Sequence, residues 1–158
     1  LNDECEMVTH KWDDVLQNKI EEFLTGKPDR LVYALINDHT HCNLSHSGAD
    51  VIHTDGCCFP LITREFAESF GGMVPGEIQG QGADSSLFRV VRDAIPDRIL
   101  DLSHDLHTLH KSVHTGGAHD DTQGHMATIS ITRQLNDIQH NNYVNRLKLG
   151  LKRNNQHI

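Results

Sequence analysis

The sequence has no long apolar run and no excess of positive charge. No apolar run in its 158 residues approaches the length of roughly 18 to 20 residues that a membrane-spanning helix needs. Its 14 lysines and arginines are outnumbered by 22 aspartates and glutamates, which gives a formal net charge of −8 at pH 7. A short basic stretch at 146–153 does not offset this charge. We therefore expect neither a membrane nor a nucleic acid as a partner.

Cysteines and aromatic residues are also few. The four cysteines are too sparse for a disulfide scaffold, although their even number permits two disulfides. Aromatic residues make up 5% of the chain, which is low. The sequence begins without the pattern of a signal peptide, but a secreted chain whose signal had been removed would look the same. We expect a soluble protein and leave its compartment and its oligomeric state open.

The length and the apolar pattern define the expected fold class. A chain of 158 residues fits one domain and can bury a core without disulfides or metals. We predict a single globular domain over 1–158, of class α/β or α+β, with one small mixed sheet and three to four helices. The expected elements are helices at 8–24, 61–70, 84–94 and 95–113, strands at 31–36, 49–53 and 126–132, a glycine-rich loop at 71–84, and either a strand or a terminal helix at 144–151.

Histidine is the residue in excess, with 13 in the chain. Apolar residues from Ile95 to Val113 recur in steps of four and three, which predicts a helix packed on a core. On that helix, at about 100° per residue, His107, His110 and His114 would fall within about 60° of one another. Because His110 and His114 are four residues apart, their imidazoles could converge on one metal ion.

A second set of potential ligands follows Gly116-Gly117, which we expect to end this helix. Imidazoles and carboxylates suit zinc, manganese, iron or copper better than calcium or magnesium. The sequence therefore predicts a site for a divalent transition metal, zinc first among them. The predicted ligands are His110, His114, His119, Asp121 and His125.

The segment His119-x-Asp121-x-x-x-His125 resembles the metal-binding stretch of the kynurenine formamidase-like cyclase family. Asp101-Leu-Ser-His104 is similar to the opening strand of that family. This chain carries one extra glycine in the motif and lacks its proline. The resemblance illustrates the chemistry, metal-dependent hydrolysis, without implying membership of the family.

In such an enzyme the metal would lower the pKa of a bound water to near neutrality and polarise a carbonyl group. Asp120 or Asp105 would then act as general base on a small-molecule or peptide substrate. Two simpler interpretations stay open. The histidines could form a solvated helix flank, or they could make a non-catalytic metal-binding or pH-sensitive module, since imidazoles become charged below about pH 6.

A second histidine cluster follows the predicted strand at 31–36. His39, His41 and His46 stand where α/β proteins often bind ligands. The text is similar to the HxHxDH loop of metallo-β-lactamase-like hydrolases, although Asn43 and Leu44 replace its aspartate and third histidine. If the two clusters met, a two-metal hydrolase would result. The alternative is a polar loop.

A cysteine hydrolase is the competing hypothesis. Cys58, after Asp55-Gly56-Cys57, would gain thiolate character at the start of the helix predicted at 61–70. His125, ahead of a predicted strand, would be its base. The text is similar to the nucleophile motif of OTU-type and viral papain-like proteases. Otherwise Cys57 and Cys58 are buried apolar residues or disulfide partners.

Overall fold

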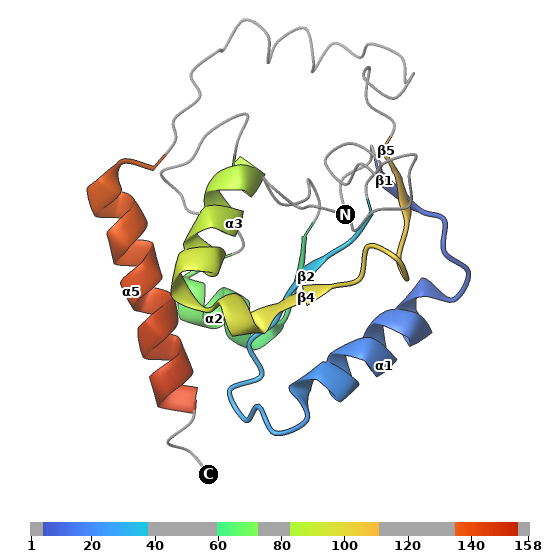
Figure 1. Cartoon of the computed structure of the whole chain (residues 1–158), viewed down its shortest axis with the longest axis horizontal. Coiled ribbons are helices and arrows are strands. Elements are labelled where there is room, and N and C mark those ends of the chain that lie inside the picture. Colours follow the sequence, from blue (N-terminus) through green and yellow to red (C-terminus); the bar gives the residue numbers. More distant parts are fainter. Residues whose placement is uncertain (1–4, 38–59, 73–82, 111–134, 155–158) are drawn as a thin grey trace, which may run out of the picture.

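The computed structural model describes residues 5–37, 60–72, 83–110 and 135–154 (Figure 1). In these residues the fold is α+β, with four α-helices, one three-stranded sheet and one two-stranded sheet. The predicted class and the predicted number of helices are therefore confirmed. None of the described helices is long and apolar enough to cross a membrane.

Strand β2 (Tyr33–Leu35) lies at the centre of the three-stranded sheet. It pairs antiparallel with β3 (Leu61–Ile62) and parallel with β4 (Ile99–Asp101), so the sheet is mixed, as predicted. All residues of the run 31–37 are buried. A continuous apolar run is typical of a strand that is covered on both faces, and this run forms the middle of the core.

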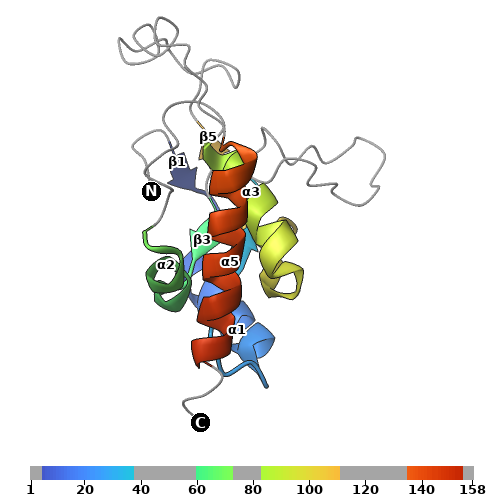
Figure 2. The ribbon, with the colours of Figure 1, turned by 90° about the vertical axis from the view of Figure 1, so that its left-hand side faces the viewer.

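Helices cover both sides of these strands. Helix α1 (Trp12–Leu24) lies on one side, and α2 (Arg64–Phe70), α3 (Ala83–Ala94) and α5 (Asp137–Asn154) lie on the other (Figure 1). On that second side the ring of Tyr33 lies 6.0 Å from the ring of Phe66 and 6.1 Å from that of Phe88. Helix α5 packs against both α2 and α3 and runs between them in Figure 2. The few aromatic residues are thus concentrated where the helices meet the sheet.

The first described residues form a strand, and the residues between it and the first helix are not helical. Strand β1 (Cys5–Met7) pairs antiparallel with β5 (Thr108–His110). Helix α1 begins only at Trp12, after Lys11 at φ 52°, so the helix predicted from residue 8 was four residues too long. The amide of Val8 donates to the carbonyl of His107 at 3.0 Å, a bond that holds this segment in the sheet.

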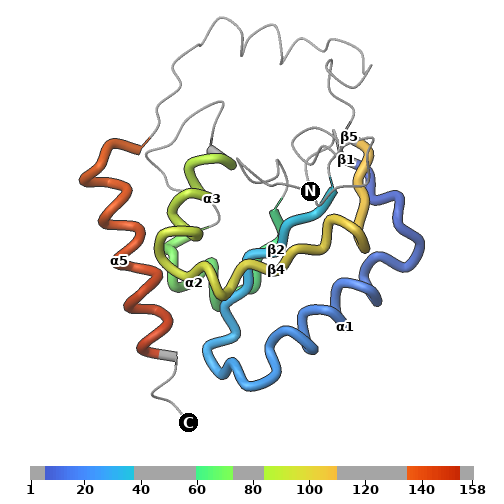
Figure 3. The backbone as a smooth tube through the Cα atoms, in the orientation of Figure 1, coloured from blue at the N-terminus to red at the C-terminus, as the bar shows by residue number. Residues whose placement is uncertain are grey.

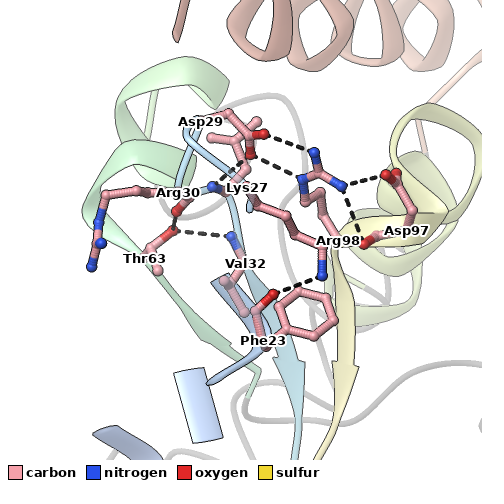
Figure 4. A network of polar contacts seen from close by, with 9 residues as sticks. Phe23, Lys27, Asp29, Arg30, Val32, Thr63, Asp97 and Arg98 are labelled. Carbon is pink, nitrogen blue, oxygen red and sulfur yellow. Dashed lines mark hydrogen bonds and ion pairs between the residues drawn. The ribbon is translucent and has the colours of Figure 1, made fainter. Parts of the chain in front are cut away.

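The helix predicted at 61–70 is divided by Thr63. Residues Leu61–Ile62 form β3, and the helix α2 begins at Arg64. The Thr63 hydroxyl accepts from the amide of Phe66 at 3.4 Å. It also accepts from the amide of Val32, at 3.1 Å, and donates to the carbonyl of Arg30, at 2.8 Å (Figure 4). One side chain therefore caps the helix and ties it to the beginning of β2.

The structure settles two other predicted elements. The helix predicted at 84–94 is α3, which begins one residue earlier, and the carboxylate of Asp84 accepts from the amide of Ser85 at 2.8 Å. Of the two alternatives for 144–151, the helix is correct, because this stretch belongs to α5. The strands predicted at 49–53 and 126–132 lie outside the described residues, as does most of the loop predicted at 71–84.

The helix predicted at 95–113 is wrong. This stretch contains a short 3-10 helix (η1, Pro96–Arg98), then β4, a turn and β5. In the turn the amide of Leu106 donates to the carbonyl of Leu102 at 2.8 Å, and both side chains are buried. The apolar steps of four and three therefore do not mark one buried face, because Leu102 and Leu106 at the turn are buried whereas Leu109 in β5 is 44% exposed. Pairing with β2 has overridden the local pattern.

Candidate functional site at the carboxyl end of the sheet

The parallel strands β2 and β4 point their carboxyl ends to the same edge of the sheet. The ends of β2 and β5 and the first turns of α3 and α5 all lie in the upper part of Figures 1 and 3. In open α/β sheets ligands bind outside the carboxyl ends of the strands, because the connections that leave this edge can surround a ligand. A ligand site that involves the histidine-bearing segments is therefore expected at this end of the sheet.

Two residues form the point of contact at this edge, Asn37 after β2 and His107 before β5. They are bridge partners in parallel orientation. The amide of Asn37 donates to the carbonyl of Leu106 at 2.9 Å, and the amide of Thr108 donates to the carbonyl of Asn37 at 2.8 Å. Asn37 is fully buried and His107 is half-buried.

The backbone amide and carbonyl of His107 are hydrogen-bonded to residues 8 and 9 of the N-terminal segment. Its amide donates to the hydroxyl of Thr9 at 2.9 Å, and its carbonyl accepts from the amide of Val8 at 3.0 Å. The Thr9 hydroxyl in turn donates to the carbonyl of Asp105 at 3.4 Å. His107 is thus held in extended backbone between the end of β2 and residues 8–9.

The predicted ligands begin just beyond this contact. The second predicted cluster, with His39, His41 and His46, follows Asn37 in the chain, and the other predicted site residues that follow His110 are His114, His119, Asp120, Asp121 and His125. All eight residues lie outside the described residues. The two segments from which they continue are hydrogen-bonded to each other, at Asn37 and Thr108.

His110 lies in β5, opposite Cys5 in the register with β1. The prediction that His107, His110 and His114 lie on one side of a single helix is therefore wrong. In extended backbone, positions separated by an odd number of residues lie on opposite faces, so positions 107 and 110 do not share a face. The argument that His110 and His114 converge because they are one helical turn apart is lost with the helix.

Asp105, one of the two predicted general bases, lies in the turn before β5. Its Oδ1 atom is 3.0 Å from Nζ of Lys19, which comes from α1. Both side chains are partly exposed, at 34% and 42%, so the pair contributes little to stability. The carboxylate is oriented toward α1 by this contact, and the catalytic role of Asp105 stays a prediction.

Cys57 and Cys58 lie outside the described residues. The residues that follow them show where the helix predicted at 61–70 begins, and the proposed activation of Cys58 depends on that position. Because β3 and the cap residue Thr63 come first, α2 begins at Arg64, six residues after Cys58. The N-terminus of α2 is therefore not at Cys58, and the role of Cys58 as a nucleophile stays a prediction.

Potential metal ligands do not gather within the described ranges themselves. In 5–37, 60–72, 83–110 and 135–154 there is no group of three or more histidine, cysteine, aspartate or glutamate side chains that could hold a metal ion. A metal site of the predicted kind must therefore include residues outside these ranges.

The opposite end of the sheet contains a buried ion pair that the sequence analysis missed. Arg98 donates from Nε to Oδ1 of Asp29 at 2.9 Å and from Nη2 to Oδ2 at 2.7 Å, and it also contacts Asp97 (Figure 4). Burial acts to raise the pKa of Asp29, but the hydrogen bonds from Arg98 and from the amide of Leu31 outweigh it, so the pKa lies below its usual value. Hydrogen bonding to Asp29 likewise raises the pKa of Arg98.

Asn37 and Thr9 were missed as residues of the candidate site, whereas His107 was recognised as part of a histidine stripe but was not among the predicted ligands. A signal existed for Asn37, because a polar residue at the end of a buried apolar run marks the exit of a strand. Thr9 gave no such signal, since its partner His107 is 98 residues away. No protein-family model matches the chain, and no curated protein or solved structure shows significant similarity to it.

Proposed function

We propose that this chain is a metal-dependent hydrolase whose site lies at the carboxyl end of the sheet. The observation that supports the proposal is the backbone contact between Asn37 and His107, from which both histidine-rich segments continue. The proposed ligands are drawn from His110, His114, His119, Asp121 and His125, with His39, His41 and His46 from the other segment.

The sequence positions of the two segments support the participation of both. Asn37 and His107 are bridge partners, and paired strands are separated by about 4.8 Å. His39 follows Asn37 by two residues in the sequence, and His110 follows His107 by three. We therefore propose that both segments contribute ligands to one ion or to two neighbouring ions.

The chemistry follows from the type of ligand. Neutral imidazoles with one carboxylate are typical of catalytic zinc sites, which keep one coordination position open for water. A metal held in this way would lower the pKa of that water to about 7 and polarise the carbonyl group of a small-molecule or peptide substrate. Asp120 is the proposed general base, because Lys19 already engages the carboxylate of Asp105.

The first test is elemental analysis of the protein purified without a histidine tag. We expect near-stoichiometric transition metal in the wild type and its loss in the His110→Ala/His114→Ala variant. The matched control is His10→Ala/His140→Gln, which also removes two histidines and should keep the metal. His10 is exposed in a turn, and His140 lies on α5, where its Nε2 is 2.9 Å from Oδ2 of Asp93. A wild type without metal, even after incubation with zinc, would overturn the proposal.

The competing hypotheses differ in their response to two treatments. A metal-dependent hydrolase should lose ester or peptide hydrolysis on chelation and keep it in Cys58→Ala. A cysteine hydrolase with Cys58 as nucleophile and His125 as base should show the reverse and should react with a thiol-directed probe. A non-catalytic metal-binding module should bind metal but hydrolyse none of the substrates.

A further inference from the structure

We infer that a charged groove at the amino end of the sheet binds a small organic anion, a molecule with a carboxylate or phosphate group. The groove has a volume of about 570 Å³ and is lined by residues 28–30, by α2 and by α5. The two helices pack against each other (Figure 2). Because the groove lies at the other end of the strands from the proposed metal site, the inference is independent of the proposed function.

Two arginines of α5 supply the positive charge of this groove. Arg146 and Arg153 are seven residues apart, which is two helical turns, so they lie on the same face of α5 and both line the groove. The guanidinium carbon of Arg146 is 5.1 Å from the ring centre of Tyr143, a contact that orients the side chain. Within the parts of the chain that the structure describes, neither guanidinium has an ion pair or a hydrogen bond.

Most of the other charged side chains of the groove already have partners. The carboxylate of Asp29 is held by Arg98 (Figure 4), and Nε of Arg30 lies 3.6 Å from the carboxylate of Glu65. The exposed Glu68 has no ion pair among the described residues, but the two arginines of α5 outnumber it. The groove is therefore locally positive in a chain of net charge −8. Guanidinium groups bind carboxylates and phosphates through paired N–H donors, so the expected ligand is an anion.

The lining also indicates that this anion has a carbon skeleton. Leu149 lines the groove and is 53% exposed, and Pro28 adds apolar atoms to the same lining. An inorganic ion would leave these atoms in water, whereas an organic anion covers them, and the removal of apolar surface from water stabilises a complex. Arg146 and Arg153 are separated by about 10.5 Å along the helix axis, so a molecule with two anionic groups is able to contact both.

The test is isothermal titration calorimetry of the full chain with two probes, glutarate and glycerol 3-phosphate, at constant ionic strength. We expect at least one probe to bind at a single site, and the stronger of the two identifies the carboxylate or the phosphate as the preferred group. Arg146→Gln/Arg153→Gln should weaken this binding by at least about tenfold, because the charge-assisted hydrogen bonds are lost.

The matched control is Lys148→Gln/Lys152→Gln. It removes the same two positive charges from exposed positions on the opposite face of α5, outside the groove, and should change the affinity by less than about twofold. Thermal melts establish that both double variants fold. An equal loss of affinity in the two double variants would overturn the inference, because binding would then reflect a general attraction to a basic helix.

A second measurement uses only the wild type. In ¹⁵N-labelled protein, the Nε–Hε signals of Arg146 and Arg153 should shift when the bound probe is added, while that of Arg89, which is exposed on α3, should not. If neither probe binds, or if these two signals do not move, the inference fails. The proposed metal site is tested separately by elemental analysis, so either result leaves it unaffected.

Discussion

The two ends of the three-stranded sheet use polar residues in opposite ways. At the amino end, just before β2 and β4, Asp29 and Arg98 form a buried ion pair with two hydrogen bonds. At the carboxyl end of the same strands, Asn37 and His107 are joined through their backbones, and His107 remains half-buried. The first arrangement holds the fold together, whereas the second precedes the segments that carry the proposed metal ligands.

This comparison suggests that stability and chemistry are separated along the strands. A buried pair penalises the loss of either partner, because the remaining charge is left without compensation. A backbone contact tolerates changes in the side chains that it supports. Substitutions at the amino end should therefore affect unfolding far more than metal binding, and substitutions at the carboxyl end should do the opposite.

The largest expected effect is that of Arg98→Met. It leaves the carboxylate of Asp29, whose side chain is 0% exposed, without its cation. We expect the free energy of unfolding to fall by about 3–5 kcal/mol, measured by urea denaturation. The control is Asp29→Leu/Arg98→Met, which removes both charges and should recover most of the loss. A drop below about 1 kcal/mol for Arg98→Met would break the comparison, because the pair would then not be essential.

Gly150→Ala should have the next largest effect. A Cβ atom at position 150 of α5 would lie 2.5 Å from Cβ of Ser69 on α2, so the two helices would have to separate. We expect a loss of about 1–2 kcal/mol, because overpacking costs about 1–3 kcal/mol and alanine returns up to about 1 kcal/mol of helix propensity. Asn145→Ala, on the exposed side of the same helix, should be neutral or slightly stabilising. Adding Ser69→Gly to Gly150→Ala should relieve the contact, and failure to do so would contradict this explanation.

Thr9→Val tests the carboxyl end and should have a smaller effect on stability. Valine keeps the shape of threonine but leaves the amide of His107 without the hydroxyl that accepts its hydrogen bond at 2.9 Å. We expect a loss of about 1 kcal/mol, since the site is only partly buried. Zinc affinity should fall as well, because the backbone of His107 is less firmly held. The control is Thr25→Val. The hydroxyl of Thr25 donates to the carbonyl of Glu21 at an exposed helix end, so its loss should change neither the free energy of unfolding nor the zinc affinity.

The smallest effect is that of mild acid on the Asp29–Arg98 pair. The pKa of Asp29 is lowered in the folded protein from an ordinary value of 3.8. Its stabilising contribution is therefore complete well above pH 3.8 and is lost as the pH falls toward the folded pKa. Linkage limits the loss by pH 3.8 itself to less than about half a kcal/mol. The measurement is the free energy of unfolding of the wild type and of Asp29→Leu/Arg98→Met, from denaturation curves between pH 6 and pH 3. The difference between the two proteins isolates the contribution of the pair and should shrink as the pH falls. A difference that grows as the pH falls would contradict the lowered pKa of Asp29.

Local patterns in the sequence were sufficient where burial and periodicity agree. The apolar run at 31–36 predicted the central strand, and the potential helix cap at 84–86 predicted α3. Around residues 95–113 the same reasoning failed, because the apolar steps of four and three there do not mark one buried face. The choice between a helix and two strands depends on β2, more than 60 residues earlier in the chain, which no local window includes.

For the candidate site, residue types were predictable and their arrangement was not. The excess of histidine predicted which residue type would bind a metal, but which histidines share a face depends on whether the backbone is helical or extended. The pairing of Asn37 with His107, and that of Asp29 with Arg98 across 69 residues, arises only from the tertiary fold. The role of Thr63, which joins a strand to a helix through one hydroxyl, is likewise visible only once both neighbours are in place.

The pairing of the first described residues with β5 also has a consequence for the order of folding. Thr9 meets His107 across 98 residues, so this contact closes one of the longest loops in the described fold. Loops of this size form late, because their closure costs entropy before any contact compensates for it. On the ribosome, residues 5–9 must wait until β5 has emerged. The pairing of β1 with β5 can therefore form only after α1, β2, α2, α3 and β4 have emerged, whereas α5, which follows β5 in the chain, emerges later still.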